Sequence, residues 1–150
     1  MLPRYSKPTH HETDSFFLVI LFQTALFSQS ETVSGTYQLN FEGSYGIYNE
    51  TLTLYSDSSF EFLSYKKFDG MHPPESYTHG KGTWELKKNI VYFTTTESDL
   101  DSKHTLDLNN TEARFSTKSP RAKSSRETPT TLRVFKSDVE WLVGRNLVKE

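Results

Sequence analysis

The fold is decided by residues 48–62, which read YNETLTLYSDSSFEF. Leu52 and Leu54 alternate with threonines, and the polar run Ser-Asp-Ser-Ser then precedes Phe60. Apolar and polar side chains that alternate with a period of two are typical of a half-buried β-strand. Turn-forming residues between two such runs indicate an antiparallel hairpin. We therefore expect a hairpin whose loop spans about residues 56–59.

The same alternation recurs along the chain and predicts an all-β fold. Further strands are expected at Gly35 to Phe41, Gly80 to Leu86, Ile90 to Phe93, His104 to Leu108, Ala113 to Ser116, Thr131 to Lys136, Val139 to Val143 and Leu147 to Val148. Short connections without crossover helices favour a small antiparallel up-and-down barrel of about eight to ten short strands, or a sandwich. The polar stretches 66–78 and 117–130 are expected to be surface loops, the second of them mobile.

Length and composition narrow the class of protein. A chain of 150 residues fits one domain, and a formal net charge of −2 gives no drive toward nucleic acid. The chain has no cysteine, which excludes disulfides, thiol catalysis and Cys-ligated metal centres. We expect no nucleic-acid partner and no cofactor.

The N-terminal segment has the layout of a signal peptide. Residues 16–27 hold ten apolar residues among twelve and follow a stretch with Arg4 and Lys7. A membrane-spanning helix needs about 20 apolar residues, and this run is shorter. We expect residues 1–28 to be a signal peptide, residues 29–150 to form the domain, and the mature chain to be secreted or periplasmic without a membrane anchor. The alternative is that the apolar run forms a buried core element.

Three short motifs carry a family resemblance. They are GTY at residues 35–37, GIYNETLTLYSDSSF at residues 46–60, and GTW at residues 82–84 followed by a charged turn and IVYF. Together they resemble a bacterial envelope lipocalin-like small β-barrel domain, and are similar to the N-terminal domain of outer-membrane lipoproteins linked to copper resistance and envelope stress. The Cys residues of those lipoproteins are absent here. The resemblance implies a small barrel in, or secreted from, a bacterial envelope.

The interior of such a barrel can be filled by side chains or can hold one small ligand. The inward-facing set is expected to be Tyr37, Leu39, Phe41, Leu52, Leu54, Phe60, Phe62, Trp84, Leu86, Tyr92, Leu106, Phe115, Val134, Trp141 and Val143. If a cavity exists, its aromatic lining is predicted to be Tyr37, Phe62, Trp84, Tyr92 and Trp141. Dense packing of so many rings would instead leave a solid core.

One segment brings metal-ligating residue types together. His72, Glu75 and His79 offer imidazole and carboxylate ligands within eight residues. Their spacing matches no established site, and two prolines suit an exposed connector whose histidines are solvated. We therefore expect no metal and keep these three residues as weak candidates.

Charged residues elsewhere are expected to be solvated. Lys118, Arg121, Lys123 and Arg126 lie on the 117–130 loop, where they could touch an anionic surface. Glu50 and Glu61 are expected on the outer face of the hairpin. No arrangement of nucleophile, base and orienting group is recognisable, so we do not expect an enzyme.

The function expected from sequence is therefore binding rather than catalysis. The leading hypothesis is an exported lipocalin-like barrel that binds a small apolar ligand in a modest aromatic-lined cavity. The alternative is a solid-core envelope module that contacts a partner protein or an anionic surface through loops 66–78 and 117–130.

Overall fold

Eight antiparallel strands close into a barrel in the computed structural model, which describes residues 32–118 and 128–150. The strands are β1 (Gly35–Gly43), β2 (Gly46–Leu54), β3 (Ser59–Phe68), β4 (Glu75–Lys87), β5 (Ile90–Thr94), β6 (Glu112–Ser116), β7 (Thr131–Lys136) and β8 (Asn146–Lys149), with 3-10 helices η1 (Glu97–Asp99) and η2 (Glu140–Leu142). Each strand pairs with the next in sequence, and β1 pairs with β8. The predicted all-β, up-and-down barrel is confirmed. The expected signal peptide, residues 1–28, lies outside the described residues.

The predicted hairpin is the β2–β3 pair. Its register runs from Gly46 opposite Phe68 to Leu54 opposite Phe60. The loop is closed by a hydrogen bond from the amide of Tyr55 to the carbonyl of Ser59 at 2.9 Å. Asp57 accepts hydrogen bonds from the amide and hydroxyl of Ser59 at 2.9 and 2.6 Å. Short polar side chains thus stabilise the turn locally, as their composition predicts.

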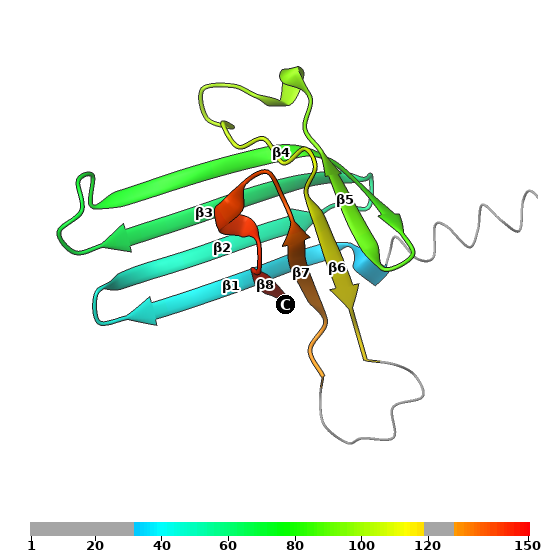
Figure 1. Cartoon of the computed structure of the whole chain (residues 1–150), viewed down its shortest axis with the longest axis horizontal. Helices are drawn as coiled ribbons and strands as arrows, with labels where there is room; N and C mark the ends of the chain where they lie inside the picture. Colours follow the sequence, from blue (N-terminus) through cyan, green and yellow to red (C-terminus); the bar gives the residue numbers. More distant parts are fainter. Residues whose placement is uncertain (1–31, 119–127) are drawn as a thin grey trace, which may run out of the picture. The chain divides into compact units, whose positions relative to one another are not determined.

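Strands β1 to β4 are longer than the alternation predicted and form one broad curved sheet, with β5 to β8 crossing it (Figure 1). The expected loop 66–78 is wrong: β3 continues to Phe68, and β4 begins at Glu75. Lys67 and Glu75 are register partners and form an ion pair at 3.0 Å. Cross-strand charge pairing supports this extension, although its residues are polar. Of the expected loop 117–130, residues 119–127 lie outside the described part.

The closed part of the barrel is filled by side chains. The buried apolar residues are Val33, Tyr37, Tyr48, Leu52, Leu54, Phe60, Phe62, Trp84, Val91, Phe93, Leu106, Leu108, Ala113, Phe115, Leu132, Val134, Leu142 and Leu147. Two expected inward positions are wrong: Val143 is 47% exposed, and Tyr92 alternates with the buried Val91 and Phe93. Phe41 does lie on the inner face, opposite Tyr48, but it is 59% exposed because it lies beyond the closed part of the barrel.

Two predicted strands are wrong for a common reason. His104 to Leu108 forms only an isolated bridge to His79, and Val139 to Val143 contains η2. The first segment buries Leu106 and Leu108, whereas the second buries Leu142 and only partly covers Val139 and Trp141. Neither segment has a strand partner along its length. Alternation reports burial of one face, and irregular chain packed on a barrel can satisfy the same pattern.

The β7–β8 connection is an ordered segment that folds onto the barrel. The amide of Leu142 donates to the carbonyl of Val139 at 3.0 Å, and the Val143 amide donates to Glu140 at 3.2 Å. Gly144 then takes a φ of 91°, a left-handed conformation that glycine adopts without strain. This turn lets the chain reverse into β8 and places η2 next to the inner face of β3.

Candidate functional site

The inner face of the β1–β4 sheet carries a polar layer above the core. In the register of β2 and β3, Leu52 faces Phe62 in the core, and Glu50 faces Ser64 in the next inward-facing pair. The pair after that, toward the hairpin ends, is Tyr48 and Lys66. Because inward-facing residues alternate along each strand, these pairs form successive layers. We call the end of the barrel beyond the Glu50 and Ser64 layer the mouth.

Glu50 is fully buried in this layer. Its Oε1 accepts a hydrogen bond from the hydroxyl of Tyr48, and the Nε of Arg145 lies 3.7 Å from the same oxygen. Burial raises the pKa of the Glu50 carboxyl from 4.5 to about 7, although the charges of Arg145 and Lys66 act in the opposite direction. Glu50 therefore changes its protonation state near neutral pH.

Two buried polar atoms in the layer have no hydrogen-bond partner among the described residues. They are Oε2 of Glu50 and Oγ of Ser64. Both residues are at most 1% exposed. A buried polar group without a partner costs about 1–3 kcal/mol, and native proteins usually satisfy such groups with protein, water or ligand. The layer thus offers hydrogen-bonding capacity that this part of the protein leaves unused.

Two cations stand above the layer and are held by aromatic rings. The Nζ of Lys66 lies 4.5 Å from the ring centre of Trp141 and 5.4 Å from that of Tyr48. The guanidinium of Arg145 lies 4.5 Å from the ring centre of Tyr48, and its Nε donates to the carbonyl of Trp141 at 3.0 Å. Cation–π contacts of this kind fix long side chains in place. The mouth therefore presents positive charge in a defined position.

A pocket of about 410 Å³ opens at the mouth. Its lining residues are Leu39, Phe41, Tyr48, Lys66, Phe68 and Arg145. Three of them are apolar and come from β1 and β3, while the two cations lie beside the polar layer. Pockets that bind small molecules are typically apolar with a few polar groups at defined points, which is the arrangement here.

The sequence-predicted lining is only partly assembled. Phe62 and Trp141 lie together, with ring centres 6.2 Å apart. Tyr37 and Trp84 are buried in the core, where the Trp84 indole donates to the carbonyl of Tyr55 at 3.0 Å. Tyr92, the fifth residue of the predicted set, lies on the outer face, where the Nζ of Lys87 is 5.5 Å from its ring centre.

Sequence reasoning missed the residues of the polar layer. Glu50 was expected on the outer face with Glu61. Glu61 does lie there, paired with Thr53, but Glu50 is wrong because it is buried on the inner face opposite Ser64. The signal was present in the alternation itself. Glu50 lies two positions before Leu52 in the same strand, so it must point inward with that leucine. Arg145 could not be found from sequence because the fold of the β7–β8 connection positions it.

The weak metal candidates are not brought together. Glu75 pairs with Lys67 and lies four positions before His79 in the same strand, a distance of about 13 Å. His72 lies in the β3–β4 turn. Among residues 32–118 and 128–150, no group of three or more His, Cys, Asp or Glu residues is placed to hold a metal ion.

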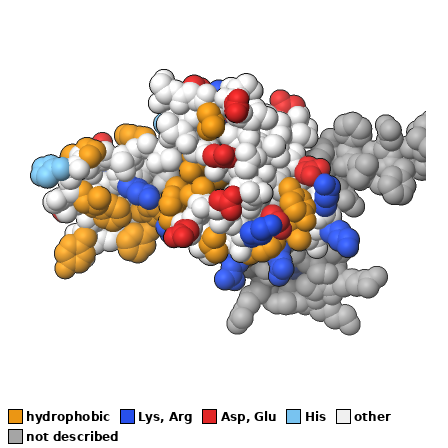
Figure 2. All heavy atoms as spheres, turned by 45° about the horizontal axis from the view of Figure 1, so that its top comes forward, with side chains coloured by type: hydrophobic (Ala, Val, Ile, Leu, Met, Phe, Trp, Pro, Cys, Tyr) orange, Lys and Arg blue, Asp and Glu red, His pale blue; other side chains and the backbone are white. Residues whose placement is uncertain are grey.

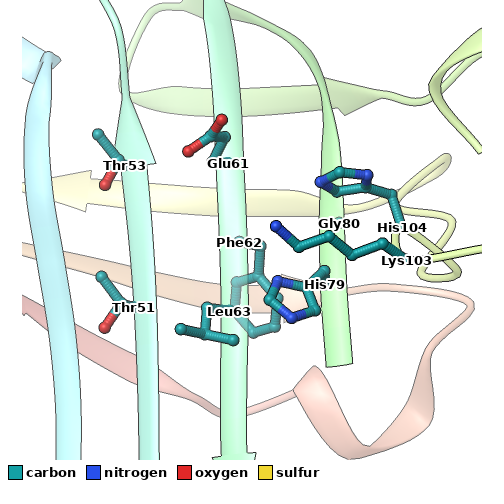
Figure 3. A pocket seen from close by; sticks show the side chains of 9 residues that line it. All are labelled: Thr51, Thr53, Glu61, Phe62, Leu63, His79, Gly80, Lys103 and His104. Atoms are coloured by element: carbon teal, nitrogen blue, oxygen red, sulfur yellow. The ribbon is translucent and has the colours of Figure 1, made fainter. Parts of the chain in front are cut away.

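A second pocket, of about 290 Å³, lies on the outer face of the sheet (Figure 3). It is lined by Thr51, Thr53, Glu61, Phe62, Leu63, His79, Gly80, Lys103 and His104. Burial, Lys103 and His104 lower the pKa of His79. His104 pairs with Asp101 at 2.9 Å. This groove is polar and lacks the unpaired buried atoms of the mouth, so the mouth is the stronger candidate.

Fold and site together define a small closed antiparallel barrel with a charged, apolar-rimmed mouth. Comparisons with protein-family models, with curated proteins and with solved structures gave no match. Within the described ranges 32–118 and 128–150, no helix has the length and apolar character needed to cross a membrane.

Proposed function

We propose that this protein is an exported, non-enzymatic, lipocalin-like barrel that binds a small, largely apolar ligand in the pocket at its mouth. The observation that supports this most is the pocket of about 410 Å³ above a layer with two unpaired buried polar atoms. Its volume lies within the range of roughly 300–1,000 Å³ common for small-molecule sites. Export is inferred from the N-terminal residues and from the envelope resemblance.

The binding site proposed here is at the mouth, whereas the sequence predicted a cavity inside the barrel. Large side chains such as Tyr37, Leu54 and Phe60 are at most 1% exposed and fill the closed part of the barrel. Interiors packed at this density leave no room for a ligand. The apolar side chains at the mouth, Leu39 and Phe68, are only partly buried and can gain contact area from a ligand.

Tryptophan fluorescence tests this proposal, because Trp141 lies at the mouth and Trp84 in the core. A panel of acyl and aromatic compounds is titrated into the wild type and into Trp141→Phe. We expect saturable quenching in the wild type and little change in Trp141→Phe. Phe68→Ala should weaken binding, whereas Tyr77→Ala, which truncates an exposed ring, should not. Absence of a saturable response to any compound would contradict ligand binding.

The alternative function, an envelope interaction module, is favoured by a different observation. Hydrophobic side chains gather at the free ends of the β1–β4 hairpins (Figure 2). Phe41, Tyr45, Met71 and Tyr77 are 59%, 83%, 55% and 60% exposed. Exposed apolar clusters often mark interaction surfaces.

Native mass spectrometry of the protein purified from its own host distinguishes the two functions. A co-purifying small molecule supports the binding proposal. A stoichiometric protein complex that is lost in Tyr45→Ser/Met71→Ser supports the interaction module instead.

A further inference from the structure

We propose that the ligand of the mouth is an amphipathic monoanion, whose carboxylate-type head group lies between Lys66 and Arg145, above the buried Glu50, and whose apolar tail lies on the rim. This inference rests on the proposed function and adds the chemical class of the ligand. The head group would be held by Lys66 and Arg145. The tail would contact the apolar rim formed by Leu39, Phe41 and Phe68.

The charge balance of the mouth favours an anion. Lys66 and Arg145 both line the pocket, and Glu50 is the single carboxylate beneath them in the described structure. Burial keeps much of the Glu50 population protonated near neutral pH. The mouth then carries up to two positive charges without an equal negative charge. In a partly desolvated pocket, such a pair attracts a carboxylate more strongly than it does on an open surface.

The two cations supply the hydrogen bonds that a head group needs. Both Lys66 and Arg145 line the pocket, whereas the unpaired atoms of Glu50 and Ser64 are buried beneath it. A carboxylate accepts several hydrogen bonds, which an ammonium and a guanidinium can donate. A neutral alcohol accepts weaker hydrogen bonds without the charge, and a cation accepts none.

The arrangement also predicts how binding depends on pH. The charged or titratable groups that face Glu50 are Tyr48 from its own strand, Lys66 from β3 and Arg145 from the β7–β8 connection. β1 contributes the apolar Leu39. When Glu50 ionises, it repels an anionic head group and offsets part of the positive charge of Lys66 and Arg145. Affinity for the anion should therefore fall as pH rises through about 7.

Calorimetric titration with matched head groups tests the inference. The probes are decanoate, 1-decanol and decyltrimethylammonium, each below its micelle concentration and at pH 6. The pair 4-phenylbutyrate and 4-phenylbutanol covers an aromatic tail. We expect each carboxylate to bind at least about tenfold more tightly than its alcohol, as the loss of a charge-assisted hydrogen bond of roughly 1.4 kcal/mol or more implies. The cation should not bind.

Variants locate the head group. Lys66→Gln should reduce carboxylate affinity about tenfold or more and leave alcohol affinity nearly unchanged. Lys67→Gln is the matched control, because Lys67 lies next in sequence on the opposite face, paired with Glu75. Glu50→Gln should abolish the fall in affinity between pH 6 and pH 8, a readout that does not depend on the lysine variants.

The possible results separate the inference from the function on which it rests. Equal binding of carboxylate and alcohol would overturn the anionic head group and leave the binding proposal intact. Preference for the cation would do the same. Failure of all five probes to bind would contradict both.

Discussion

At the scale of single residues, the most informative feature is an acidic side chain on the inner face of a barrel. Glu50 continues the inward row of Leu52 and Leu54, yet it carries a carboxyl group into a fully buried position. The Tyr48 hydroxyl and the nearby Arg145 both interact with Oε1 of this carboxyl group and leave Oε2 without a partner among the described residues. Burying such a group costs free energy, so its presence is not explained by stability. The proposed binding role would explain it.

The raised pKa of Glu50 predicts a pH-dependent stability. Between 4.5 and about 7, the folded protein keeps a proton that the unfolded chain has released. The free energy of unfolding should therefore fall as pH rises through this window and be flat above it. Glu50→Gln has no such titration. The difference in the free energy of unfolding between the variant and the wild type should therefore shift by about 3 kcal/mol in favour of the variant from pH 4 to pH 8.

Urea denaturation across this pH range measures the effect. Glu42→Gln, which changes an exposed carboxylate on β1, serves as the control and should follow the wild type. If stability depended on pH in the same way in the wild type and in Glu50→Gln, the Glu50 carboxyl would have the same pKa in the folded and unfolded states, which would contradict this prediction.

Ser64 provides a second test at this scale. Because its buried Oγ has no partner among the described residues, Ser64→Ala should raise the free energy of unfolding by about 1 kcal/mol in the absence of ligand. Ser59→Ala, which removes a hydroxyl donating to Asp57 at 2.6 Å, should lower stability instead. Thermal unfolding distinguishes these outcomes, and a loss of stability in Ser64→Ala would indicate that the hydroxyl is already satisfied.

At the scale of elements, period-two alternation predicted the strands and failed at the connections. It correctly placed β2, β7 and the start of β3 because both faces of these segments are defined by a core and by solvent. It wrongly assigned strands to His104–Leu108 and Val139–Val143, where irregular chain packs on the barrel. The candidate site depends on the second of these segments. Alternation along the sequence therefore could not predict the candidate site, although it did indicate that Glu50 points inward.

The close approach of β4 to the end of β5 requires a glycine within β4. A Cβ on Gly82 would lie 2.2 Å from the carbonyl oxygen of Thr94 and 3.0 Å from the ring of Phe60. Backbone cannot move aside as a flexible side chain can, so Gly82→Ala should destabilise the fold by about 3 kcal/mol.

Chemical denaturation measures this loss. The matched control is Gly43→Ala, whose Cβ would meet only the exposed ring of Phe41 at 3.1 Å. Its cost should be below about 1 kcal/mol. Equal effects of the two substitutions would be inconsistent with a close backbone approach at Gly82.

At the scale of the whole molecule, closure of the barrel is uneven. The β1–β2 register extends from Gly35 to Gly43, whereas β1 and β8 share only the pairs of Tyr37 with Lys149 and Gln38 with Val148. The seam is extended by the amide of Glu150, which donates to the carbonyl of Thr36 at 3.0 Å, and by its carboxylate, which accepts from Gln38 at 2.6 Å. The short seam lies beside the β7–β8 connection that completes the mouth.

Hydrogen exchange should reveal this unevenness. The amide of Glu150 should exchange through an opening of lower free energy than amides in the middle of β3, which is paired on both sides. Gln38→Ala should lower the protection of Glu150 further and leave β3 unchanged. Equal protection across the barrel would mean that the seam opens only with global unfolding.

Ligand binding at the mouth is tested most directly by the backbone amide spectrum during titration with decanoate at pH 6. We predict saturable shifts at Leu39, Tyr48, Lys66, Phe68 and Arg145, with Thr53, His79 and His104 of the outer groove unchanged. Shifts confined to the outer groove, or no shifts at the highest monomeric decanoate concentration, would contradict binding of this ligand class at the mouth.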